Sequence, residues 1–92
     1  MVYGEFVQKP AVELCKLLAK QLPKQKDWSV YLTNSGTEAT EGSLKLAKHY
    51  TGKNEFVALT HSFHGRTYAT LSITGNSGRK EHGGPYMPGV SF

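Results

Sequence analysis

The chain has 92 residues, 38% of them apolar and 11% aromatic, which is enough for one small domain and excludes a disordered tail. Its formal charge of +4 comes from basic and acidic residues interleaved along the sequence, so we expect an ordinary solvated surface and no nucleic-acid partner. The single cysteine, Cys15, excludes an internal disulfide, and no apolar run approaches the ~18 residues of a membrane span. We therefore expect a soluble, intracellular α/β protein that does not enter a membrane.

The first half of the sequence predicts a helix, a strand and a second helix. Apolar residues recur at helical spacing over residues 10–22, and Pro23 ends this first helix. Trp28–Thr33 is short, β-rich and mostly apolar, as a buried strand of a parallel sheet is. Ser35 then begins an amphipathic helix, because its hydroxyl can cap the backbone while Glu38 reaches back in the capping-box pattern.

The second half predicts a further strand and helix before order fades. Phe56–Leu59 is a short apolar strand, and a third helix starts near Arg66. After Gly75 the sequence is rich in glycine and proline, which predicts loops. This alternation is typical of a parallel sheet wrapped by helices, but two strands cannot complete such a sheet. We expect part of a larger α/β domain, cut at its C-terminal end and at its N-terminal end.

One candidate binding motif is formed by Ser35, Gly36 and Thr37 at the start of the second helix. Glycine lets the backbone approach a phosphate closely, the flanking hydroxyls add donors, and a helix N-terminus favours an anion. The alternative is an ordinary capped helix, which the local chemistry alone favours.

A second candidate motif, Phe63, His64, Gly65 and Arg66, follows the next predicted strand. Open α/β sheets bind ligands at the carboxyl ends of their strands. A phenyl ring there can stack on a flat heteroaromatic ring, and the guanidinium of Arg66 matches a carboxylate. The alternative is a partly buried phenylalanine beside a surface arginine. Two such motifs at successive strand–helix junctions favour a site for a phosphorylated, flat-ringed cofactor.

Two other patterns predict little by comparison. His61 and His64 lie three apart on an extended segment, so their imidazoles point to opposite sides, and we expect no metal site. Gly75–Gly78, followed by Arg79 and Lys80, is similar to the Gly-x-x-Gly clamp of KH-type RNA-binding modules. That module needs a helix directly after the loop, and residues 81–85 do not favour one.

Four segments of this sequence closely resemble the class III aminotransferases, the pyridoxal-phosphate group that includes ornithine, acetylornithine, 4-aminobutyrate and alanine–glyoxylate aminotransferases. They occur in the family's order and at family-like separations, and the resemblance spans residues 13–88. The segments are Thr33–Glu41, Leu44–Ala47, Ser62–Thr67 and Leu71–Gly75.

The resemblance implies a cofactor, pyridoxal 5′-phosphate, and a role for each motif. Ser35–Thr37 match the loop that holds the cofactor phosphate, and Phe63 matches the aromatic side chain stacked on the pyridine ring. His64 matches its neighbour in that wall, and Arg66 matches the arginine that grips a substrate carboxylate. The reaction implied is amino-group transfer from an amine or amino acid to an oxo acid.

The resemblance also implies the fold-type I large domain, with a mostly parallel sheet flanked by helices and an active site shared across a homodimer. The resemblance implies that residues 1–92 are a fragment from the N-terminal part of that domain, without the rest of the large domain and the small domain. It implies a cytoplasmic protein or, in a eukaryote, one of the mitochondrial matrix. The family's aspartate for the pyridine nitrogen and its Schiff-base lysine lie downstream of the Phe-His-Gly-Arg motif, beyond Phe92. No catalytic residue is therefore assigned here, and we expect the 92-residue chain alone to be inactive.

Two alternatives to this interpretation remain open. The chain could be a small non-enzymatic module that binds an anion or RNA through Ser35–Thr37 or Gly75–Gly78. It could also be the product of a split gene that complements a second polypeptide.

Overall fold

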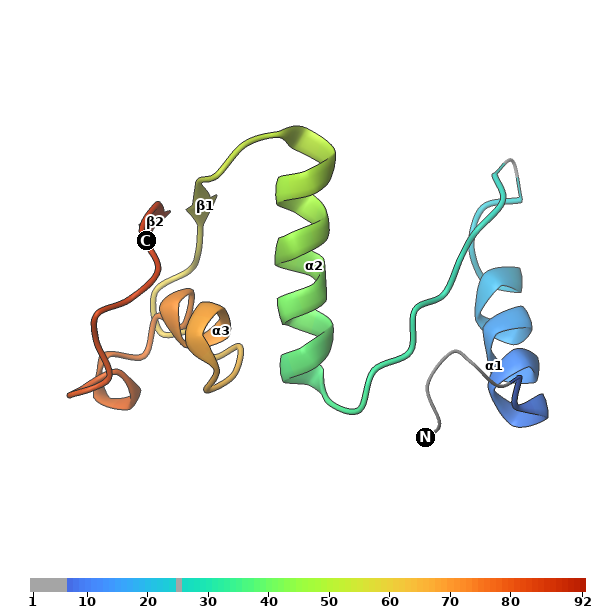
Figure 1. Cartoon of the computed structure of the whole chain (residues 1–92), viewed down its shortest axis with the longest axis horizontal. Coiled ribbons are helices and arrows are strands. Elements are labelled where there is room, and N and C mark those ends of the chain that lie inside the picture. The colour runs from blue at the N-terminus through green and yellow to red at the C-terminus, as the bar shows by residue number, and fades with distance from the viewer. Residues whose placement is uncertain (1–6, 25) are drawn as a thin grey trace. The chain divides into compact units, whose positions relative to one another are not determined.

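The computed structural model describes residues 7–24 and 26–92, and the chain divides into two compact units, Met1–Leu32 and Thr33–Phe92. Within the described ranges no helix is both long enough and apolar enough to cross a bilayer. Figure 1 shows the elements in chain order: α1 (Lys9–Lys20), α2 (Gly36–Thr51), β1 (Phe56–Val57), α3 (Tyr68–Ser72), the 3-10 helix η1 (Ser77–Arg79) and β2 (Val90–Ser91).

In the described part of the first unit, α1 is followed by turns and then by a segment without regular structure over residues 27–32. Pro10 lies in the first turn of α1, where its missing N–H is not needed, and the helix passes into a turn at Gln21. The predicted helix over residues 10–22 is confirmed to within two residues at either end. Leu17 on this helix is 58% exposed, so α1 keeps apolar surface uncovered.

The predicted strand at Trp28–Thr33 is wrong. These residues are extended but have no partner strand in the described part of the chain, and a strand exists only where a neighbour takes up its backbone hydrogen bonds. The Trp28 indole instead donates to the carbonyl of Pro23 at 2.8 Å. Tyr31 is 85% exposed, in contrast to the buried environment that the apolar composition predicted.

Helix α2 begins where the sequence predicts. Ser35 is extended, and its hydroxyl oxygen accepts from the Glu38 backbone N–H at 3.1 Å. The other half of the predicted capping box differs, because the Glu38 carboxylate accepts from the Ser35 hydroxyl and not from its backbone N–H. At the far end Gly52 adopts a left-handed conformation and donates its N–H to the carbonyl of Lys48 at 2.8 Å, which ends the helix.

The sheet consists of two short parallel strands. Only Phe56–Val57 of the predicted strand at residues 56–59 is regular, and it pairs with β2, with Phe56 opposite Val90. The Ala58 N–H extends the pairing by donating to the carbonyl of Ser91 at 2.8 Å. β2 was not predicted, because its two residues follow a glycine- and proline-rich loop and are too few to show the alternation of apolar and polar residues that marks a strand. The parallel direction agrees with the predicted sheet type.

The core of the second unit lies on α3 and the residues that follow it. α3 starts two residues after Arg66, close to its predicted position. Ile73 is the only buried apolar side chain among the described residues, and the side chains buried with it are hydroxyls: Thr70, Ser72 and Thr74. Each has a backbone partner, as buried polar groups require; Thr74 donates to the carbonyl of Thr70 at 2.8 Å.

Gly75 occupies a position that admits no side chain. A Cβ built on it would lie 2.2 Å from the carbonyl oxygen of Leu59 and 2.8 Å from the backbone nitrogen of His61. We expect Gly75→Ala to lower the free energy of unfolding by about 2 kcal/mol or more, because the clash is with backbone. Gly78→Ala is the matched control, since its Cβ would meet nothing closer than 3.6 Å. Equal midpoints for both variants in urea denaturation would contradict this prediction.

Candidate functional site

The N-terminus of α2 supplies unused backbone donors. The first N–H groups of a helix have no intrahelical acceptor, and the Ser35 hydroxyl takes only that of Glu38. No acceptor for the Gly36 and Thr37 amides lies in the described part of the chain. A Cβ on Gly36 would meet nothing within 4 Å, so the surface beside these amides is open. The arrangement suits an anion such as a phosphate.

The Ser35 hydroxyl makes two hydrogen bonds at the start of α2, and its use as a donor to a ligand stays a prediction. It already accepts from the Glu38 N–H and donates to the Glu38 carboxylate at 3.1 Å. These bonds stabilise the start of α2, where the Gly36 and Thr37 amides have no acceptor among the described residues.

The second motif forms the loop between β1 and α3. Phe63 is 50% exposed, and the guanidinium carbon of Arg79 lies 5.3 Å from the centre of its ring. The side chains of His64 and Arg66 are also exposed. The loop thus presents an aromatic surface, an imidazole and a guanidinium to its surroundings, which can stack on a flat ring and pair with a carboxylate.

Hydrogen bonds to the residues after α3 hold this loop in place. The Gly75 N–H donates to the backbone carbonyl of Ser62 at 3.0 Å, and the His61 N–H donates to the carbonyl of Gly75 at 3.3 Å. The His64 N–H donates to the buried hydroxyl of Thr74 at 3.1 Å. These bonds fix the backbone on both sides of Phe63, so the exposed ring stands on a supported loop.

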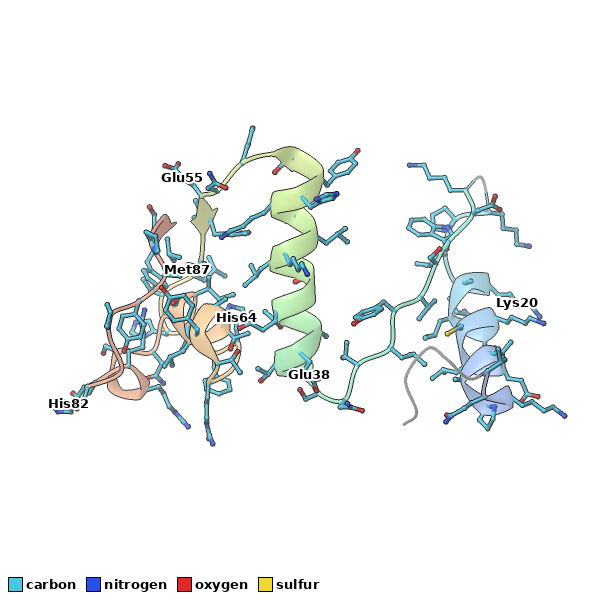
Figure 2. All side chains as sticks on the ribbon, in the orientation of Figure 1. Lys20, Glu38, Glu55, His64, His82 and Met87 are labelled. Atoms are coloured by element: carbon cyan, nitrogen blue, oxygen red, sulfur yellow. The ribbon has the colours of Figure 1, made fainter. Side chains whose placement is uncertain are left out.

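The two motifs meet at Gly65. Its φ is +144°, and a Cβ built on it would lie 2.6 Å from both the Thr37 and the Thr70 hydroxyl oxygens. The side chain of Thr37 therefore packs directly on the Gly65 backbone, between the start of α2 and the Phe63–Arg66 loop. Figure 2 shows Glu38 in the first turn of α2 and His64 beside α3. The structure thus brings together the two predicted motifs.

Glu41 is a residue whose contacts sequence reasoning did not find. Its carboxylate, on α2, accepts from the Thr67 hydroxyl at 2.5 Å and from the backbone N–H groups of Ala69 and Thr70 at 3.1 and 3.2 Å. The only signal in the sequence was its position four residues after Thr37, which places both side chains on one face of α2.

The residues of the RNA-binding alternative are engaged within the chain. Arg79 lies over Phe63, and the Lys80 ammonium lies 4.6 Å from the ring centre of Tyr86 and donates to the carbonyl of Ser72 at 3.2 Å. The backbone makes a 3-10 turn over Ser77–Arg79, and the next regular element in the described residues is β2, not the helix that a KH-type clamp requires. The structure gives this alternative no support.

The residues present fit a phosphorylated flat ring: two helix-terminal amides for the phosphate, a half-exposed phenyl ring and a nearby guanidinium. Together with the parallel strands and flanking helices, they define part of an α/β cofactor-binding domain. The family described as Aminotransferase class-III matches residues 1–92. The chain belongs to this family.

Named relatives agree with the family. The chain is 48% identical over 80 residues to an acetylornithine aminotransferase of Lactiplantibacillus plantarum, a match that covers 87% of this chain and 21% of that protein. It is 47% identical over 77 residues to an acetylornithine aminotransferase of Methanothermobacter thermautotrophicus, covering 84% of this chain and 18% of that protein. The chain therefore spans about a fifth of the length of these curated relatives.

Solved structures give the fold. A Bacillus anthracis aminotransferase matches with a TM-score of 0.84 at 26% identity, covering 98% of this chain and 21% of that one. An omega transaminase of Pseudomonas jessenii in complex with PMP matches with a TM-score of 0.81 at 26% identity, covering 97% of this chain and 21% of that one. The predicted fold class, an incomplete part of a fold-type I large domain, is confirmed.

The contact between Thr37 and Gly65 can be measured by a double-mutant cycle. We expect Gly65→Ala to lower the free energy of unfolding by ~1–3 kcal/mol, because the new methyl clashes and φ is unfavourable. Thr37→Ala removes both Thr37 atoms that the methyl would meet. In that background the cost of Gly65→Ala should fall, giving a coupling of at least ~0.5 kcal/mol in urea denaturation. Strictly additive costs would show that the two motifs do not touch in solution.

Proposed function

We propose that this chain forms the phosphate- and ring-binding half of the site of a pyridoxal-phosphate-dependent aminotransferase. The observation that carries the proposal is the packing of Thr37 on Gly65, which joins the anion-binding start of α2 to the Phe63–Arg66 loop. Membership of the class III family and the likeness to a transaminase in complex with PMP support it.

Each motif then has a distinct task. The backbone amides of Gly36 and Thr37 bind the cofactor phosphate, and Ser35 holds the start of α2 in the geometry that directs them outward. Phe63 stacks on the pyridine ring, and His64 stands beside it in the same wall. When bound, the cofactor accepts the amino group and acts as an electron sink. The chain's contribution is to bind and orient it.

Arg66 recognises the substrates in this proposal. Its exposed guanidinium offers paired N–H donors for a carboxylate, which an amino-acid donor and an oxo-acid acceptor both carry. The relatives named acetylornithine aminotransferases favour donors of that class.

The proposal extends to a homodimer in the cytoplasm, or in the mitochondrial matrix of a eukaryote, with no nucleic-acid or membrane partner. Dimer and location rest on the family resemblance.

Binding of pyridoxamine 5′-phosphate tests the assignment. This ligand has the phosphate and the ring but no aldehyde, so it forms no imines with surface lysines. We expect Phe63→Ala to weaken its binding about threefold to tenfold through loss of stacking. Thr37→Ala keeps the backbone amide but removes the side chain that packs on Gly65, so it should weaken binding by a similar factor by freeing the loop from the α2 amides. Isothermal titration calorimetry gives the dissociation constants.

Two matched variants serve as controls for this titration. Tyr50→Ala removes an aromatic ring that is 87% exposed on α2, and Thr40→Ala removes a threonine from the same helix. Both should bind like the original chain. If Phe63→Ala and Thr37→Ala also leave the affinity unchanged, the site assignment is wrong.

Catalysis is expected to be absent from the 92-residue chain on its own. Transamination needs a lysine for the covalent link to the cofactor and an aspartate at the ring nitrogen, and no lysine present has the family's context for that role. An assay with an amino acid and an oxo acid should show no amino-group transfer above background. Measurable transfer by the pure chain would contradict this expectation.

An in-frame coding sequence after the Phe92 codon that carries the lysine and the aspartate would support the proposal that the chain is part of an aminotransferase.

A further inference from the structure

Glu41 makes the longest-range polar contact between the two helices of the candidate site. One oxygen of its carboxylate accepts three hydrogen bonds from residues 26 to 29 positions later in the chain: the Thr67 hydroxyl and the Ala69 and Thr70 amides. Hydrogen bonds to an ionised acceptor are stronger and shorter than neutral ones. A single side chain of α2 therefore holds the start of α3.

The start of α3 uses this acceptor in addition to a local capping box between Thr67 and Thr70. Thr70 is fully buried, so its backbone N–H needs a partner inside the protein. The Thr70 hydroxyl, which lies at the same end of the helix, is taken by the Thr67 N–H at 3.0 Å. The Thr67 side chain also accepts from the Thr70 N–H in this capping box, whereas the Ala69 N–H donates to Glu41. The carboxylate of Glu41 also complements the positive end of the helix dipole.

Glu41 and Thr37 hold the loop from the same side. They lie four residues apart in α2 and so share one face of that helix. Thr37 packs on Gly65, and Glu41 binds Thr67 two residues further on. Arg66 lies between these two points of attachment. The placement of Arg66, and of Phe63 before it, relative to the α2 amides is therefore set by these two contacts.

We propose that Glu41 is a positioning residue, whose hydrogen bonds to Thr67, Ala69 and Thr70 set the distance between the phosphate-binding start of α2 and the ring- and carboxylate-binding loop. It touches neither ligand and acts through α3. The inference rests on the proposed function, because it assigns the two sides of one cofactor site to the two elements that Glu41 joins.

The test compares two ligands on the complete 92-residue chain. Inorganic phosphate reports on the α2 amides alone, whereas pyridoxamine 5′-phosphate needs the amides and the Phe63 loop together. We expect Glu41→Ala to weaken pyridoxamine 5′-phosphate about tenfold and phosphate less than about twofold, because it releases the loop and leaves the α2 terminus intact. Amide hydrogen exchange at Ala69 and Thr70 should accelerate in the same variant.

Two further variants separate positioning from general stability. Glu41→Gln keeps an oxygen that can accept the same bonds, so it should restore pyridoxamine 5′-phosphate affinity to within about threefold of the original chain. Glu55→Ala removes an exposed carboxylate of the same unit, which Figure 2 labels at the end of the loop after α2, and should change neither affinity. If Glu41→Ala fails to fold, Thr67→Val removes the hydroxyl contacts to Glu41 and Thr70 but keeps the Ala69 and Thr70 amide bonds to the carboxylate, and it should shift the ratio of the two affinities in the same direction.

The outcomes distinguish this inference from the proposed function. An original chain that binds no pyridoxamine 5′-phosphate contradicts both. If the original chain binds it, and the foldable variants bind it equally well or lose both ligands by the same factor, the positioning role alone is overturned.

Discussion

The carboxylate of Glu41 against the start of α3 is the contact on which the second unit depends. Apolar burial contributes little there, since Ile73 is the only buried apolar side chain in the described residues and each strand has two residues. Hydrophobic contact is also non-directional and would leave the helices free to slide. Three hydrogen bonds to one oxygen are directional and weaken steeply with misalignment. The relation between α2 and α3 is therefore set by polar geometry.

Close backbone approach is the second constraint, and it explains two glycines. At Gly65 the hydroxyls of Thr37 and Thr70 occupy the space of a side chain, and at Gly75 the backbone of Leu59 and His61 does so. The first glycine lets α2 meet the loop, and the second lets the chain after α3 bond to the start of that loop. Glycine in the Phe-His-Gly-Arg motif thus has a packing reason that is independent of any ligand.

Local signals predicted the helices well and the strands poorly. The start of α2 follows from the Ser35 hydroxyl, a contact made within four residues, so the sequence could specify it. Trp28–Thr33 has strand composition without a partner, and β2 has a partner without a recognisable pattern. Pairing is a non-local property, and composition alone cannot supply it. Glu41 was missed for the same reason, because its acceptor role depends on residues 26 to 29 positions away.

The backbone hydrogen bonds and close approaches that shape the candidate site lie within residues 35–75, although the chain spans about a fifth of the curated relatives. Large apolar side chains on the same unit remain exposed, among them Leu46 on α2 and Val57 on β1. None of the bonds that place Phe63, Gly65 or the α2 amides involves those side chains. The bonds that shape the phosphate- and ring-binding geometry are therefore polar, and burial of the exposed apolar side chains would add stability to that geometry.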